Sequence, residues 1–192
     1  MDVRPILLSF QTAIIAILFT FVLGTGVAYI VFRLKNRKLK ILLNSLFTLP
    51  LVLPPTVFGF FLLTIFGVQQ PVGQFLLDFF AIQVVFSWPA TVIAAVAVSF
   101  PLMYRSALTA FEQMDSELLA VAQTLGFSES RYFRKIALPL SMNGLLAGGV
   151  LAFARGLGEF GATTMLAGNI AGKTRTLPLA IYSAVASGDW RL

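Results

Sequence analysis

Long runs of the sequence carry no charged residue, and this feature limits the possible folds more than any other. The runs cover residues 5–32, 41–77, 79–104 and 136–154. A helix needs about 20 mainly apolar residues to cross a bilayer, so each run can supply one crossing. Backbone amides in lipid must find partners within the chain, and the alternation typical of barrel strands is not visible. We therefore expect an all-α integral membrane protein with several spans.

The residue types that are missing exclude much chemistry. The chain has no cysteine and no histidine, which removes disulfides, thiolate or imidazole metal sites, cysteine nucleophiles and histidine proton relays. We expect no catalytic residue, no metal and no cofactor bound by this chain. The net charge of +6 comes from basic residues beside apolar runs, where they set topology and meet lipid headgroups rather than nucleic acid.

A basic loop orients the first two spans. The first helix is expected over residues 6–32, and residues 33–40 then carry five positive charges and no negative one. By the positive-inside rule this loop is cytoplasmic and the amino terminus lies outside. The second span, residues 41–66, contains prolines that should kink or break it: Pro50, Pro54 and Pro55.

The second half of the chain predicts two further spans. Residues 72–83 suggest a short interfacial or re-entrant stretch, and a third span is expected over residues 84–104. Residues 105–135 hold four basic and four acidic residues, which predicts a cytoplasmic segment long enough to dock a partner. A fourth span should start near residue 140 and run towards residue 166, interrupted by Arg155 and Glu159. Residues 167–192 should lie outside or dip back into the bilayer, and no later span is expected.

The cytoplasmic segment contains a short amphipathic helix. Asp115 or Ser116 can cap it, and Gly126 can close it in the left-handed conformation, while Ser128 can cap a second helix. An apolar stripe at positions i, i+3, i+4 and i+7 is predicted on the first helix: Leu118, Val121, Ala122 and Leu125. The stripe could pack against the protein's own helix ends, or it could enter a partner's groove. The pattern alone leaves both open.

The spacing around this helix resembles the EAA loop of ABC importer permeases. Ala120, Val121 and Ala122 are followed after three residues by Gly126, and after nine more by a second motif: Ile136, Ala137, Leu138 and Pro139. In that family the pattern is Glu-Ala-Ala, three residues, Gly, nine residues, Ile-x-Leu-Pro. Here Ala120 stands in place of the family's Glu and Val121 in place of its first Ala, and Glu117 begins the same helix. The resemblance implies coupling helices within about residues 105–139 that sit in a groove of an ATPase subunit.

The resemblance extends over nearly the whole chain, which is similar to molybdate permeases. The motifs that carry it lie at residues 49–55, 99–103, 151–155, 158–163 and 174–178. It implies a single transmembrane permease domain over residues 1–192 in the cell inner membrane, of the type I importer kind. It also implies a homodimer, a cytoplasmic ABC ATPase dimer that hydrolyses ATP, and an extracytoplasmic molybdate-binding protein. Sulfate and tungstate permeases share parts of the motifs. Molybdate permeases normally have one more carboxy-terminal helix, which this sequence lacks, so we expect a truncated chain.

Charged and kinking residues within the spans are candidates for the pathway or its gate. Arg155 and Glu159 lie four residues apart on one helix face, where an ion pair could either hold helices together or line the pathway. Kinked helices expose backbone groups towards cavities, which adds Pro50, Pro54 and Pro55 as candidates. Thr163, in the motif at residues 158–163, is a further candidate. Gly144 and Gly148 form a small-x-x-x-small pair suited to close helix packing.

Residues 167–174 satisfy a relaxed phosphate-loop pattern, but the pattern should be a decoy. A phosphate loop needs a preceding strand and a following helix, whereas this segment follows a membrane span. We expect an external loop in which Lys173 and Arg175 attract an anion or contact a delivering protein. From another class, an ion-gradient-driven secondary transporter or channel would also suit intramembrane charges and broken helices, but it leaves the coupling loop unexplained.

Overall fold

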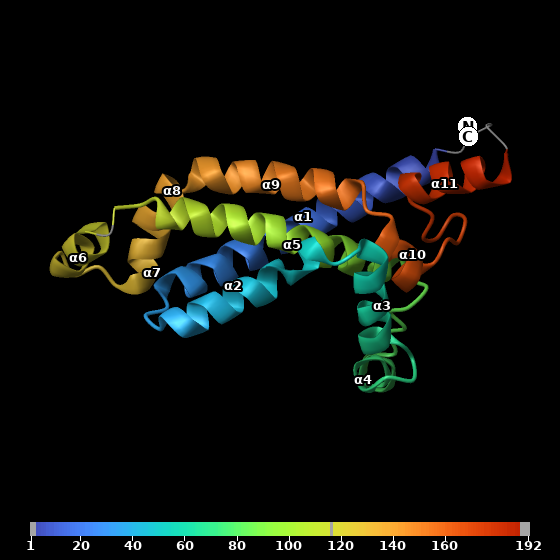
Figure 1. Ribbon diagram of the computed structural model, residues 1–192, viewed down its shortest axis with the longest axis horizontal. Coiled ribbons are helices and arrows are strands. Elements are labelled where there is room, and N and C mark those ends of the chain that lie inside the picture. The colour runs from blue at the N-terminus through green and yellow to red at the C-terminus, as the bar shows by residue number, and fades with distance from the viewer. Residues whose placement is uncertain (1–2, 116, 189–192) are drawn as a thin grey trace.

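The computed structural model describes residues 3–115 and 117–188, and within these residues it contains helices and no strand. Figure 1 shows their order along the chain. The elements are α1 (Arg4–Arg33), α2 (Arg37–Val52), α3 (Pro55–Phe66), α4 (Pro71–Phe80), α5 (Trp88–Glu112), α6 (Glu117–Thr124), α7 (Glu129–Tyr132), the π-helix η1 (Phe133–Ala137), α8 (Leu138–Leu140), α9 (Met142–Leu157), α10 (Gly161–Ala167) and α11 (Leu177–Ser187). The expected all-α class is confirmed for the part of the chain that the structure describes.

The centre of the fold is a bundle of α1, α5 and α9 (Figure 1). Lipid tails are as apolar as leucine, so helices in a bilayer associate through small residues and hydrogen bonds. Between α1 and α5, the hydroxyl oxygens of Thr12 and Thr91 lie 3.0 Å apart. On α9, a Cβ at Gly148 would lie 2.5 Å from the Cβ of Ser106, and Gly144 approaches Ala110 as closely. The packing expected for the glycine pair is thus confirmed.

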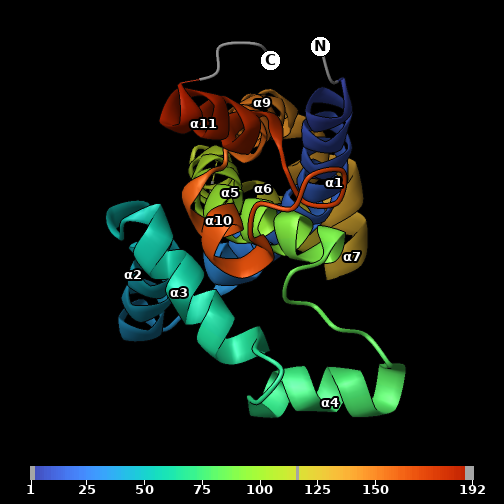
Figure 2. The same cartoon turned by 90° about the vertical axis from the view of Figure 1, so that its right-hand side faces the viewer.

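Two helices, α1 and α5, are long and apolar enough to cross a membrane on their own. The count reaches four only if α2 with α3, and the stretch Glu129–Leu140 with α9, are each taken as one broken span. The first pair bends by 114° between Val52 and Pro55, which confirms that the prolines break the second span. Figure 2 shows the consequence, because α3 and α4 swing away from the bundle. The short stretch expected over residues 72–83 is helix α4.

The boundaries of the third and fourth spans differ from the expected ones. The third helix begins at Trp88 and continues to Glu112, so the segment expected to be a loop from Arg105 starts as helix. The reason is that four residues around Arg105 are buried at the spacing of one helix face: Tyr104, Ala107, Leu108 and Phe111. The fourth span is not continuous to residue 166, since α9 ends at Leu157 and α10 begins at Gly161.

The chain then returns to the start of the bundle. Helix α11 follows the loop at residues 168–176, and the N–H of Leu177 donates to the Ser9 hydroxyl of α1 over 2.7 Å. At the opposite end of the bundle lie α6 and α7 (Figure 1). The candidate docking residues and the broken helices α3 and α10 therefore occupy opposite ends of the molecule.

Candidate functional site

Local hydrogen bonds define the ends of α6. The N–H of Glu117 donates to Asp115 Oδ1 over 2.9 Å, which confirms Asp115 as a cap, while Ser116 lies outside the described residues. Gly126 has φ of 75°, in the left-handed region that glycine tolerates best. The N–H of Phe127 then donates to Ala122 O over 2.9 Å and closes the helix. The chain around α6 is therefore set by short-range capping.

The apolar stripe of α6 is divided between the protein's own core and the surface. Ala122 is 2% exposed, and Leu118 and Leu119 pack against the same core. Val121 and Leu125, in contrast, are 54% and 70% exposed. The predicted single face is therefore wrong in detail: Leu118 and Ala122 lie on the inner side, with Leu119, and Val121 and Leu125 lie on the outer side. Glu117 and Ala120 are exposed as well.

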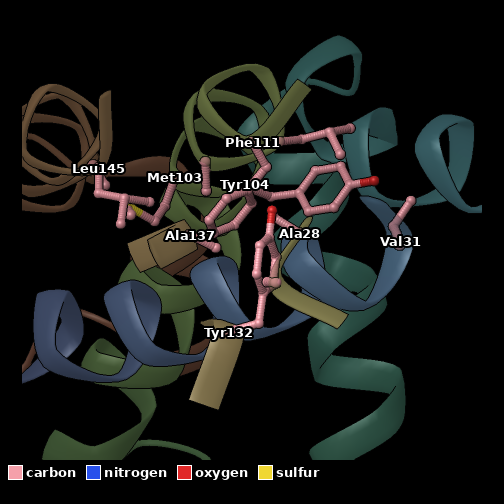
Figure 3. Close-up of a cluster of buried hydrophobic side chains, with 12 residues drawn as sticks. Ala28, Val31, Met103, Tyr104, Phe111, Tyr132, Ala137 and Leu145 are labelled. Atoms are coloured by element: carbon pink, nitrogen blue, oxygen red, sulfur yellow. The ribbon is translucent and has the colours of Figure 1, made fainter. Parts of the chain in front are cut away.

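The connection from α6 into the bundle passes through α7. The hydroxyl of Ser128 accepts from Arg131 N over 3.4 Å and caps α7 as expected. Tyr132, at the end of α7, is buried among residues of α1 and α5 (Figure 3). The rings of Tyr29 and Phe133 lie 4.5 Å apart, and Tyr29 and Phe111 5.5 Å. This aromatic cluster fixes α7 and η1 against the carboxy-terminal ends of α1 and α5.

An ion pair adds a second link between α7 and α1. Arg33 Nη2 lies 2.6 Å from Glu129 Oε1, and a separate pair joins Lys40 to Glu112 over 2.7 Å. The basic residues 33–40 predict a role for Arg33 in topology but do not predict this contact. The charge pattern offers no signal for it, because the two residues are 96 positions apart.

The second half of the candidate loop is helical and bent. The N–H of Leu138 donates to Phe133 O, five residues back, which makes η1 a π-helix, a form often found at functional sites. Ile136 and Leu138 are half-buried against the core, and Pro139 is exposed. The chain then bends by 72° at Ser141 before α9. Of the Ile-x-Leu-Pro residues, Pro139 alone is exposed.

Glu159 connects the broken helices α9 and α10. Its side chain is 1% exposed, and its Oε2 lies 2.6 Å from Nη1 of Arg155. Its other oxygen, Oε1, accepts from the N–H of Ala162 over 2.7 Å, in the first turn of α10. A carboxylate at a helix N-terminus also interacts favourably with the helix dipole. The Arg155 guanidinium and the Ala162 N–H therefore stabilise the carboxylate from two sides, and Thr163 is buried one residue beyond Ala162.

The start of α3 packs against the start of α10. A Cβ at Gly161 would lie 2.8 Å from the Cβ of Pro55, and one at Gly59 would lie 2.7 Å from Ala162 Cα. The structure thus brings Pro55 close to the segment with Glu159 and Thr163. Pro54 precedes α3 as its cap residue, and Pro50 lies half-buried within α2.

The phosphate-like loop uses its backbone donors internally. The N–H groups of Lys173, Thr174 and Arg175 all donate to Ile170 O, so they do not form a cradle for phosphate. Arg175 Nε donates to Asn169 Oδ1 over 2.8 Å, whereas Lys173 is exposed. The segment is a loop between α10 and α11, as expected. Within the described residues no group of three or more carboxylate side chains could hold a metal ion.

These features define a helical membrane protein with a structured loop at one end of the bundle and broken helices at the other. Residues 20–187 match the family described as the inner membrane component of binding-protein-dependent transport systems, and the chain belongs to this family. The permease protein YvgM of Bacillus subtilis is 46% identical over 96% of this chain and 81% of its own length. The molybdenum transport system permease proteins ModB of Haemophilus influenzae and Escherichia coli K12 are each 44% identical. The alignments cover 96% and 95% of this chain, and 80% and 79% of those proteins.

Removing Arg155 tests whether Glu159 depends on its partner. We expect Arg155→Met to destabilise the protein by about 3 kcal/mol, because it leaves a buried carboxylate unpaired. Adding Glu159→Gln should recover part of this loss, since the neutral amide oxygen can still accept from Ala162. Lys40→Met is the control, and it should cost at most about 1 kcal/mol because the carboxylate it leaves unpaired, Glu112, is exposed to solvent, unlike Glu159. Denaturant unfolding in detergent compares these three variants with the original protein. Equal losses for Arg155→Met and Lys40→Met would contradict the assignment.

Proposed function

We propose that this chain is the permease subunit of an ATP-driven importer of molybdate. The observation that carries the proposal is its similarity, over nearly the whole chain, to proteins named molybdenum transport system permease protein. Tungstate and sulfate are the alternative anions. Membership of a binding-protein-dependent family argues against a secondary transporter or channel.

The partners follow from this function. The subunit forms a homodimer in the cell inner membrane with its amino terminus outside and α6 in the cytoplasm. A cytoplasmic ABC ATPase dimer binds the loop, and an extracytoplasmic binding protein delivers the anion. ATP is bound and hydrolysed by the partner, so this subunit catalyses no covalent step and holds no cofactor. Family membership supports the delivering partner directly, and the charge of residues 33–40 supports the orientation.

The two sides of α6 have different tasks in this mechanism. The outer side, with Ala120, Val121 and Leu125, enters a groove of the ATPase. The inner side, with Ala122, attaches the loop to the bundle. Closure of the ATPase pair draws the loops of two permeases together, and the rigid attachment passes this displacement to the membrane helices. The exposure of Val121 and Leu125 supports this division, because large exposed apolar residues outside lipid favour a partner.

The pathway candidates lie at the other end of the bundle. Pro55, Arg155, Glu159 and Thr163 gather where α3, α9 and α10 end or begin. A pathway must let the anion leave, so tight binding is not required of this subunit. Because Glu159 is neutralised by Arg155 and by the start of α10, we assign this pair to holding the broken helices at the gate rather than to binding the anion.

The function is tested by ATP hydrolysis in proteoliposomes that contain this chain and its ATPase. Binding protein loaded with molybdate should stimulate hydrolysis more than empty protein or protein loaded with sulfate or tungstate. Leu125→Ser should reduce the stimulation about tenfold, as expected for a central apolar contact. Gln123→Ser is a matched control on the same helix, and it should change the stimulation less than about twofold. Stimulation that is unaffected by Leu125→Ser would contradict the docking face, and stimulation by another anion alone would correct the substrate.

The ion pair of Arg33 and Glu129 tests the attachment of the loop to α1. Glu129 is largely exposed, so each single charge reversal should change stability by at most about 1 kcal/mol. We nevertheless expect Arg33→Glu and Glu129→Arg each to lower stimulated ATP hydrolysis and molybdate uptake, because like charges push α7 from α1. The double exchange should restore both. If the single variants keep full uptake, or the double variant fails to recover, this pair does not attach the loop.

A further inference from the structure

A polar groove lies between α5 and α9, apart from the docking face and the pathway candidates. It has a volume of about 450 Å³. Its lining combines one cation with hydrogen-bonding and small side chains: Arg105, Ser106, Thr109, Ala110, Gln113, Gly144 and Ala147. The floor is the close contact of the two helices, since a Cβ at Gly144 would lie 2.6 Å from Ala110 Cβ. The small residues therefore form the floor of the groove, and the polar side chains form its walls.

The groove carries a net positive charge. Arg105, Thr109 and Gln113 follow one another at four-residue steps on α5, so they share a helix face. Arg105 is exposed and forms no ion pair within the described part of the chain. The nearby carboxylate on α5, Glu112, is already paired with Lys40. An unpaired guanidinium with hydroxyl and amide donors beside it suits an oxyanion.

An apolar track continues from the groove towards the middle of the bundle. Gly144, Ala147 and Leu151 stand at positions i, i+3 and i+7 of α9 and share one face. Leu151 is 55% exposed, and Val150 beside it is also exposed. The polar end of the groove is the end of α5 and α9 that lies towards α6 and α7 (Figure 1). The site therefore has a charged head at the end of the bundle that lies towards α6 and α7 (Figure 1), and an apolar track that runs towards the middle of the bundle.

We propose that this groove binds an anionic phospholipid in the cytoplasmic leaflet. Arg105 pairs with the headgroup phosphate, and Thr109 and Gln113 donate hydrogen bonds to it. An acyl chain lies along Ala147 and Leu151. The apolar track favours a lipid over a free oxyanion, which would gain nothing from it, and the cytoplasmic leaflet is rich in anionic lipid. The proposal does not rest on transport, because the groove is part of this chain alone.

Native mass spectrometry of the purified full chain in detergent tests this site, with phosphatidylglycerol and phosphatidylcholine as probes. We expect phosphatidylglycerol to bind preferentially. Arg105→Gln should weaken its binding about tenfold through the loss of a charged hydrogen bond, and Thr109→Val should weaken it less. Arg37→Gln is the matched control, because it removes an exposed cation at the start of α2, outside the groove, and it should bind like the original chain. Equal binding of both lipids, or equal losses for Arg105→Gln and Arg37→Gln, would overturn the proposal.

Competition distinguishes the lipid from a free anion. Millimolar inorganic phosphate or molybdate should leave bound phosphatidylglycerol in place, because neither occupies the apolar track. Displacement that requires Arg105 would overturn the lipid assignment and identify a free oxyanion site instead. Folding of each variant is checked by its thermal unfolding midpoint, which should stay unchanged because Arg105 is exposed. Neither result depends on the ATPase or the binding protein, so failure here leaves the proposed transport function untouched.

Discussion

The carboxylate of Glu159 satisfies a requirement that the bilayer places on every broken helix. Where a helix stops in lipid, its freed backbone groups must find partners inside the protein. Glu159 accepts from the first turn of α10 and is held by Arg155 from the last turn of α9. This contact allows the chain to turn within the bundle and places α10 against the start of α3. The approach of Gly59 and Gly161 to the facing backbone depends on that position.

The sequence could predict those features of the fold that depend on residues close together in the chain. Apolar runs gave the number of possible crossings, and prolines gave the break between α2 and α3, because both effects are local. The angle of that break is set by packing of α3 against α10, which no local pattern reports. The continuation of α5 past Arg105 could have been predicted from the periodic Tyr104, Ala107, Leu108 and Phe111. The mixed charges around them suggested a loop and concealed that period.

The candidate docking segment was predictable in its caps but not in its faces. Asp115, Gly126 and Ser128 act within a few residues of themselves, so their roles follow from residue type. Which side of α6 is buried depends on the core cluster that Ala122 joins, whose other buried members, such as Phe111 and Tyr132, come from separate segments of the chain. The result is a helix with Ala122 facing the core and Leu125 facing outwards. In our account the first side transmits motion to the bundle and the second receives it from the ATPase.

The most direct test of this division uses the absence of cysteine from the chain. Ala122→Cys and Leu125→Cys each introduce a unique thiol, one on each side of α6, and labelling with a membrane-impermeant maleimide reports its accessibility. We expect Leu125→Cys to react rapidly in the permease alone and to be protected when the ATPase is bound, while Ala122→Cys reacts slowly in both states. Equal reactivity of Leu125→Cys with and without a stably bound ATPase would contradict the assignment of the outer side of α6 as the docking face.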